Sequence, residues 1–224
     1  MNRKTMGIVS LVLVIAMVLV ALWVASQIPD AARLPIHWDA NGNPNGYAGK
    51  WTALLITPVI TALLSLLFYF LPKIEPRARN LERSQGLILV AWAGILLVMI
   101  IIELMAVAGA LHWALPIQGL MLVGVGLMFV LIGDQLGKSR SMFLVGIRTP
   151  WTLSSEEVWI KTHRLGGKLT MLAGVIMIAA AFLPIPGAAI PMMIIGLVVL
   201  MAGVPVVYSY ILWRRERAAG QPSG

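Results

Sequence analysis

Long apolar segments recur along the chain, and the short stretches between them carry nearly all of its charge. A helix needs roughly 20 apolar residues to cross the hydrocarbon core of a bilayer. Six segments reach or nearly reach this length, and we predict a membrane-spanning helix for each. The predicted spans are residues 6–26, 51–71, 86–110, 116–133, 169–183 and 190–212. The predicted fold class is therefore all-α, a polytopic integral membrane protein with six transmembrane helices.

The first apolar segment allows a second interpretation. It follows Arg3 and Lys4 and ends near the small residues Ala25 and Ser26, as a cleaved signal peptide does. Its apolar run is longer than a usual signal core. We therefore prefer an uncleaved anchor, which leaves all six spans in place.

Basic residues are distributed very unequally between the two ends of the predicted spans. Fifteen of the 17 Lys and Arg residues fall on one side, and Arg33 and Lys50 fall on the other. Cytoplasmic loops carry the excess of Lys and Arg. We therefore predict cytoplasmic termini, an extracellular loop 27–50 and a cytoplasmic loop 134–168. The arginines of the basic loop 72–85 would then face anionic lipid.

Composition supports a lipid-embedded chain and excludes several kinds of site. Of the 224 residues, 59% are hydrophobic and 12% are charged, and the mean hydropathy is +0.89. The chain has no cysteine, so disulfides and thiolate metal sites are excluded. The net charge of +8 reflects membrane topology rather than direct binding of nucleic acid. We predict no cofactor and no metal.

The extracellular loop is rich in turn-forming residues. Its Asp-x-Asn-x-Asn run, which begins at Asp39, superficially resembles a calcium loop. That motif needs glycine sixth and glutamate twelfth, where this chain has proline and lysine, so we reject a calcium site. We interpret the loop as a series of turns with an exposed surface that a partner can reach. The candidate contact residues are His37, Trp38, Asp39 and Tyr47.

The cytoplasmic loop divides into two parts. Residues 142–145 are apolar and are expected in the inner membrane interface. Residues 146–151 are expected to be extended or turned, because a proline disfavours helix for the residue before it. Ser154 then begins a helix, since Ser-x-x-Glu is a capping box.

That helix is predicted to be amphipathic. Val158, Trp159, Thr162 and Leu165 share one side, so we expect the helix to lie on the inner leaflet before Gly166 and Gly167 bend the chain into the fifth span.

Arg148, which precedes this helix, has two open interpretations. It is either an anchor for lipid phosphate or a buried bidentate donor that organises the loop or binds a carboxylate of a partner.

The stretch GIRTPWTLSSEEVW-x-x-THR-x-x-G, residues 146–167, closely resembles the signature of the SdpI family of bacterial membrane immunity proteins. The pattern LPIHWDANGNPNGY-x-x-K, residues 34–50, is similar to a small domain of unknown function that often precedes it. One departure is Met142, where the family often has asparagine shortly before the block. The resemblance implies an N-terminal two-span region, 1–84, and a four-span region, 85–224.

The family resemblance implies a non-enzymatic protein of the bacterial cell membrane that protects against a secreted peptide toxin. It also implies a possible signal relay, in which a cytoplasmic transcriptional repressor is held at the membrane. Lipids, the toxin and the repressor are then the expected partners. The candidate motif and docking residues are Gly146, Arg148, Thr149, Pro150, Trp151, Thr152, Trp159 and His163.

The residues also bear on two other functions, a transporter and an enzyme. A small-solute or proton transporter could use Glu103, the one acidic residue within a predicted span, because ionisable residues in spans are functional by default. An enzyme is disfavoured because no His-Glu-x-x-His or Gly-x-Ser-x-Gly motif is present. His163 and Glu157 share one helix, and a solvated helix face explains both more simply than acid–base chemistry.

Overall fold

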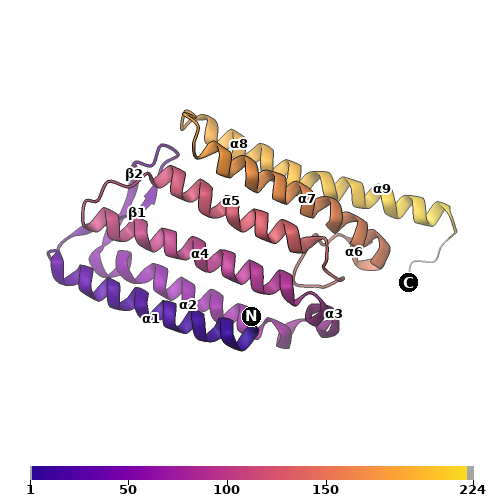
Figure 1. Cartoon of the computed structure of the whole chain (residues 1–224), viewed down its shortest axis with the longest axis horizontal. Coiled ribbons are helices and arrows are strands. Elements are labelled where there is room, and N and C mark those ends of the chain that lie inside the picture. The colour runs from indigo at the N-terminus through magenta and orange to yellow at the C-terminus, as the bar shows by residue number, and fades with distance from the viewer. Residues whose placement is uncertain (1, 221–224) are drawn as a thin grey trace.

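The computed structural model describes residues 2–220, and these form a bundle of long helices with a small β-hairpin at one end (Figure 1). The long helices are α1 (Arg3–Gln27), α2 (Lys50–Ile74), α4 (Gln85–Ala110), α5 (Ile117–Leu136) and α7 (Glu156–Ala180), followed by α8 (Ala189–Val198), the π-helical turn η1 (Val199–Gly203) and α9 (Val204–Ala218). The short elements are α3 (Ala78–Arg83), α6 (Pro150–Ser154), β1 (Arg33–Trp38) and β2 (Pro44–Gly49).

The predicted class of helical membrane protein is confirmed. Among residues 2–220, five helices are long and apolar enough to cross a membrane, namely α1, α2, α4, α5 and the continuous run from α8 to α9. The fifth predicted span lies in α7, which is not among these five and carries four charged residues in its first three turns. The count of six spans and the cytoplasmic position of both termini therefore stay predictions.

Helix α7 is continuous through the position where we predicted a bend. It runs without interruption from Glu156 to Ala180, so Gly166 and Gly167 do not separate an interfacial helix from a span. The glycines serve close packing instead. A Cβ on Gly133 of α5 would lie 2.6 Å from the carbonyl oxygen of Gly167, and one on Gly126 would lie 2.7 Å from that of Gly174. Small residues of this kind let two membrane helices approach closely.

The predicted capping box at Ser154 is also wrong. Ser154 ends α6, and the next residue, Ser155, is the N-cap of α7. The Ser155 hydroxyl accepts a hydrogen bond from the backbone N–H of Val158 at 3.2 Å. Glu156 and Glu157 occupy the first turn, where the helix dipole favours negative charge.

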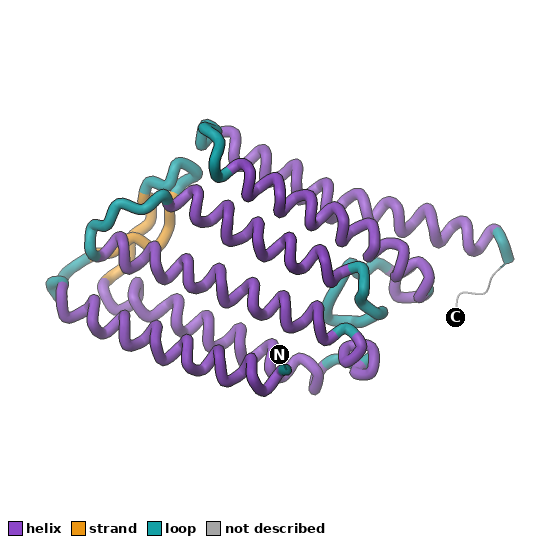
Figure 2. Tube along the Cα trace, viewed as in Figure 1, coloured by secondary structure: helices purple, strands orange, loops and turns teal. Residues whose placement is uncertain are grey.

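The loop 27–50, predicted to be extracellular, forms a two-stranded antiparallel sheet rather than turns alone (Figure 2). At its tip, one oxygen of Asp39 accepts hydrogen bonds of 2.9 Å from the backbone N–H groups of both Asn41 and Asn43. At its base, the buried Lys50 ammonium donates to the carbonyl of Ile28 and to Asp30, at 3.1 and 2.8 Å. These contacts fix the hairpin rigidly on the ends of α1 and α2.

Candidate functional site

Apart from Glu103 in α4, the sequence-predicted residues fall into two groups at opposite ends of the bundle. The hairpin group lies at the end where β1 and β2 are labelled, and the motif group lies around α6 and α3 (Figure 1). The structure thus brings each group together and keeps the two apart. The loop between α5 and α6, residues 137–149, is the centre of the motif group, and we call it the inner loop.

A buried glutamate that sequence reasoning missed anchors the inner loop. The Glu75 side chain is 4% exposed and lies just after α2. Its two oxygens accept hydrogen bonds from the backbone N–H groups of Phe143 and Leu144 at 2.9 and 2.8 Å, and one also accepts from Arg77 at 3.0 Å. Carboxylates bonded to several amides make strong charge-assisted hydrogen bonds. Glu75 therefore ties the inner loop to the end of α2.

The segment around α3 adds further contacts to the same loop. The Arg77 guanidinium donates to the Ser141 hydroxyl and to the Leu153 carbonyl, the latter at 3.2 Å. The Asn80 amide donates to the carbonyl of Ser141 at 2.8 Å. The prediction that Arg77 faces lipid is therefore wrong, because its charge is used to hold the loop.

Trp159 and His163 form the floor beneath the inner loop. Both are fully buried, and their rings stack with centroids 3.9 Å apart and planes inclined by 16°. The Nδ1–H of His163 donates to the carbonyl of Trp159 at 2.9 Å, and Nε2 accepts from the N–H of Ile147 at 2.8 Å. This pattern requires the neutral ring with its proton on Nδ1.

The interpretation of His163 as part of a solvated helix face is therefore wrong. Because both rings are fully buried, the prediction that Trp159 and His163 contact a docking partner directly is also wrong. A partner has no access to either ring, and both act as supports of the loop above them.

Gly146 lies directly against this stacked pair. Its φ is +116°, a conformation that side-chain-bearing residues rarely adopt. A Cβ built at this position would lie 2.6 Å from Nε2 of His163 and 2.8 Å from the Trp159 ring. Glycine is therefore required at this position, both because of its backbone conformation and because the two rings leave no room for a side chain.

The Thr-Pro-Trp-Thr segment forms α6 through a capping box of its own. The Thr149 hydroxyl accepts from the N–H of Thr152 at 3.1 Å, and the Thr152 hydroxyl accepts from the N–H of Thr149 at 2.8 Å. Pro150 occupies the first helical turn, where its missing N–H costs nothing. The Trp151 indole donates to Ser209 of α9. The segment therefore connects the inner loop to the last helix.

The structure contradicts one of the two interpretations of Arg148, and the other, an anchor for lipid phosphate, stays a prediction. Arg148 is exposed, so the buried bidentate donor is wrong, and its Nη1 donates to the carbonyl of Phe143 at 2.6 Å. Phe143 and Leu144 beside it are exposed apolar side chains, whereas the preceding Met142 is fully buried. We call Phe143, Leu144 and Arg148 the inner patch.

The hairpin group presents an exposed surface above an apolar cavity. His37 and Tyr47 are exposed, the latter by 51%, and Trp38 is half-buried. Asp39 is held by its turn, and hydrogen bonding from the Asn43 backbone lowers its pKa below the usual range. Within residues 2–220, no group of three potential metal ligands is present. The hairpin therefore offers a rigid contact surface with aromatic side chains.

The cavity has a volume of about 450 Å³ and lies beneath His37, Trp38 and Asp39. Its walls are side chains from α4, α5, α7 and the α8–η1 segment, all of them apolar except Gln118. Four are methionines, flexible residues that adapt to differently shaped partners. They are Met105, Met121, Met177 and Met201.

Glu103 is buried in α4. Its side chain is 6% exposed, and neither carboxylate oxygen has a hydrogen-bond partner in the described part of the chain. An unpaired ionised carboxylate within a membrane is costly, so such a residue is a candidate for function. The transport role stays a prediction, and its test is a proton flux in liposomes that disappears with Glu103→Gln.

We expect His163 to make folding stability depend on pH. Burial lowers the pKa of His163 to about 4 from 6.5. Between these values the unfolded chain binds more protons than the folded one. The contribution of neutral, buried His163 to the free energy of unfolding is therefore fully present above pH 6.5 and falls as the pH drops toward 4. One pKa unit corresponds to about 1.4 kcal/mol, so a loss of roughly 2 kcal/mol is expected at pH 5.

The measurement is chemical unfolding in detergent at pH 7 and pH 5. His163→Phe keeps an aromatic ring on Trp159 but takes up no proton, so it should be less stable at pH 7 and lose this part of the pH dependence. An unchanged pH dependence in that variant would contradict the assignment.

Both the N-terminal and the C-terminal part of the chain match known protein families. Residues 138–209 match the model of the SdpI/YfhL protein family, and residues 12–62 match that of a domain of unknown function, DUF1648. The chain is 26% identical over 209 residues to the protein named Immunity protein SdpI of Bacillus subtilis (strain 168). That similarity covers 93% of this chain and 96% of the relative. No solved structure matches the chain.

Proposed function

Because this chain carries the SdpI family domain behind a DUF1648 domain, we propose that it is a membrane immunity protein that protects its cell against a secreted peptide toxin. The observation that carries the proposal is the similarity to an immunity protein along nearly the full length of both chains. Protection by binding needs no catalytic group, so we propose a non-enzymatic protein.

The hairpin is the part of the molecule best suited to meet the toxin. It lies at the end of the bundle that the charge distribution assigns to the outside, where a secreted peptide arrives. Trp38 and Tyr47 supply aromatic surface, which often dominates binding energy at protein interfaces. The hydrogen bonds of Asp39 and Lys50 hold the surface in one conformation, which lowers the entropy cost of binding.

The apolar cavity beneath the hairpin supports the same assignment. A toxin that attacks membranes must carry apolar side chains, and the cavity could receive one such segment while the hairpin contacts its polar part. The methionine lining suits a partner that enters from the lipid phase.

We expect Trp38→Ala combined with Tyr47→Ala to weaken protection. Each buried aromatic contact at an interface is commonly worth more than 1 kcal/mol, so the pair should lower the protective effect by about tenfold or more in toxin dose. The measurement is survival of toxin-sensitive cells that express each variant, with membrane insertion checked by immunoblot.

The matched control is Trp113→Ala, because Trp113 is also 51% exposed and follows α4 near the same end of the bundle, but is not part of the hairpin. Full protection by the hairpin variant would overturn the assignment of the contact surface. Absence of protection by the unmodified chain despite normal insertion would overturn the immunity function itself.

A finer proposal concerns the inner patch. We infer that it docks a cytoplasmic transcriptional repressor, so that toxin binding outside is reported inside. Phe143 and Leu144 are exposed apolar side chains on a loop whose backbone is fixed by Glu75, and Arg148 places a positive charge beside them. An ordered surface of this composition is typical of a protein interface.

Leu144→Ser with Arg148→Glu should remove repressor docking and leave protection intact if the two functions are separate. The measurement is co-sedimentation of the repressor with inverted membrane vesicles in the presence of toxin. Arg79→Glu, an exposed charge change on α3 outside the patch, is the control. Unchanged co-sedimentation of the patch variant would contradict the docking role.

A further inference from the structure

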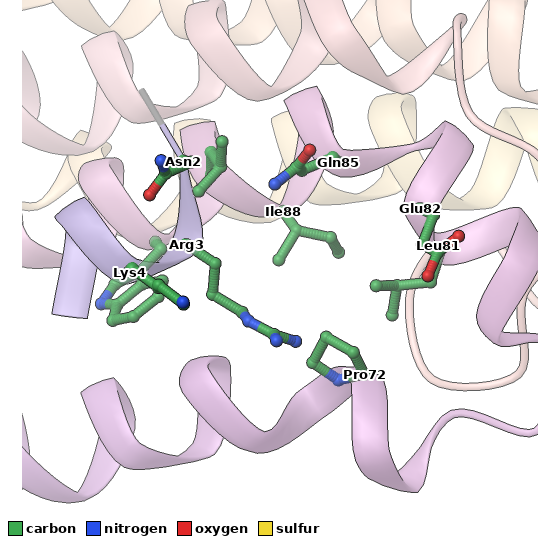
Figure 3. Close-up of a pocket in the computed structure, with 10 residues that line it drawn as sticks. Asn2, Arg3, Lys4, Pro72, Leu81, Glu82, Gln85 and Ile88 are labelled. Atoms are coloured by element: carbon green, nitrogen blue, oxygen red, sulfur yellow. The ribbon is translucent and has the colours of Figure 1, made fainter.

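A second cavity lies at the motif end of the bundle, where the start of α1 meets α2, α3 and α4 (Figure 3). Its volume is about 440 Å³. It is not part of the inner loop, and neither the hairpin nor the inner patch contributes to it. Its lining changes from polar side chains at the rim to apolar side chains at the floor.

The rim carries unlike charges on two different elements. Arg3 and Lys4 come from the first turn of α1, and Glu82 comes from α3. In Figure 3, the Arg3 side chain reaches into the cavity toward Pro72, and Glu82 lies on the other side. Among the residues that the structure describes, none of these three charges has an ion-pair partner. The Arg3 guanidinium lies over the Tyr69 ring, 5.7 Å from its centroid, a contact that leaves its N–H groups free to donate to a ligand.

The floor of the cavity is apolar. Trp92 is 1% exposed and stacks on Phe68 with ring centroids 5.8 Å apart. Leu81 and Ile88 are buried beside it. Two amide side chains, those of Asn2 and Gln85, complete the rim and can donate hydrogen bonds. A ligand of this site therefore has a polar, charged head and an apolar continuation.

We propose that this cavity binds a membrane phospholipid whose headgroup carries both a phosphate and a primary ammonium group, as phosphatidylethanolamine does. Arg3 and Lys4 hold the phosphate, since guanidinium and ammonium groups are the usual partners of phosphate oxygens. Glu82 accepts hydrogen bonds from the ammonium group. The first methylenes of the acyl chains cover Ile88 and Trp92.

The membrane setting favours lipid as the occupant. Basic pockets between transmembrane helices on the cytoplasmic side bind lipid headgroups. The charge pattern then selects among lipids. A choline headgroup has no N–H to offer Glu82, and a glycerol headgroup has no positive charge.

The test is native mass spectrometry of the full-length chain released from vesicles of equal parts phosphatidylethanolamine, phosphatidylcholine and phosphatidylglycerol. We expect one retained lipid, with phosphatidylethanolamine favoured over the other two. Arg3→Gln with Lys4→Gln should reduce retention by about 30-fold, because each basic residue near the surface contributes about fivefold. Glu82→Gln should reduce the preference over phosphatidylcholine and leave total retention largely unchanged.

Two further variants separate a built site from diffuse attraction. Gln85→Trp fills the rim without changing charge and should abolish retention. Arg214→Gln with Arg215→Gln removes the same charge from exposed positions on α9 and should have no effect.

Several results would overturn the proposal. They are equal retention of all three lipids, equal loss in the α9 control, and retention that persists in Gln85→Trp. Competition by soluble glycerol phosphate that matches competition by lipid would show a free-phosphate site and would also overturn it. None of these outcomes bears on the immunity test, which is scored by cell survival.

Discussion

Replacing Gly146 by alanine is expected to destabilise the protein by about 3 kcal/mol or more and to lower the yield of folded protein in membranes. Two costs add at this position. The backbone has a φ of +116°, and the new methyl group would overlap Nε2 of His163 and the ring of Trp159. Neither ring can retreat easily, because both are fully buried and hydrogen-bonded.

The measurement is unfolding of the purified protein in mixed detergent micelles. Gly196→Ala is the matched control, since a Cβ on Gly196 of α8 meets no atom within 4 Å. In a helix, that change should be neutral or slightly stabilising. Equal stability of the two variants would contradict the packing described for the inner loop.

Replacing Glu75 by alanine is expected to cost about 3 to 5 kcal/mol. The carboxylate accepts backbone hydrogen bonds from Arg77, Phe143 and Leu144, and its removal would leave three amides without their partner. A buried donor that loses its partner carries a desolvation penalty of about 1 to 3 kcal/mol. Glu75→Gln keeps one acceptor oxygen and should therefore lower the free energy of unfolding by less than Glu75→Ala does.

Proteolysis of the inner loop in inverted vesicles measures the effect locally, and unfolding in detergent measures it globally. Glu157→Ala is the control, because Glu157 pairs with Lys161 on an exposed helix face. Exposed pairs contribute about 1 kcal/mol or less. An inner loop that stays as protected in Glu75→Ala as in the unmodified chain would contradict the anchoring role.

Sequence reasoning predicted the helices well because their signal is local. The predicted span 86–110 differs from α4 by one residue at its start, and 51–71 differs from α2 by one residue at its start and three at its end. Apolar length alone determines such a span. The hairpin was missed because its Asn-Gly and Asn-Pro pairs were interpreted as separate turns, although such pairs also connect antiparallel strands.

The site was only partly predictable because its main contacts are distant in sequence. Glu75 lies 68 residues from Phe143, and nothing near Glu75 in the sequence points to the inner loop. The burial of His163, by contrast, has a local signal in the sequence. It lies four residues after Trp159 and three before Gly166, so all three share one helix face, and that face is buried.

Helix α2 connects the two ends of the molecule directly, because the residues that hold the hairpin and the inner loop lie at its first position and just after its last. It begins at Lys50, which fixes the base of the hairpin, and the residue after its end is Glu75, which holds the inner loop. A helix of 25 residues is about 37 Å long, so one continuous helix, with Pro58 and Pro72 inside it, spans the distance between them. If a peptide bound at the hairpin shifts α2 along its axis, the Glu75 carboxylate would move with the helix, and with it the backbone of Phe143 and Leu144.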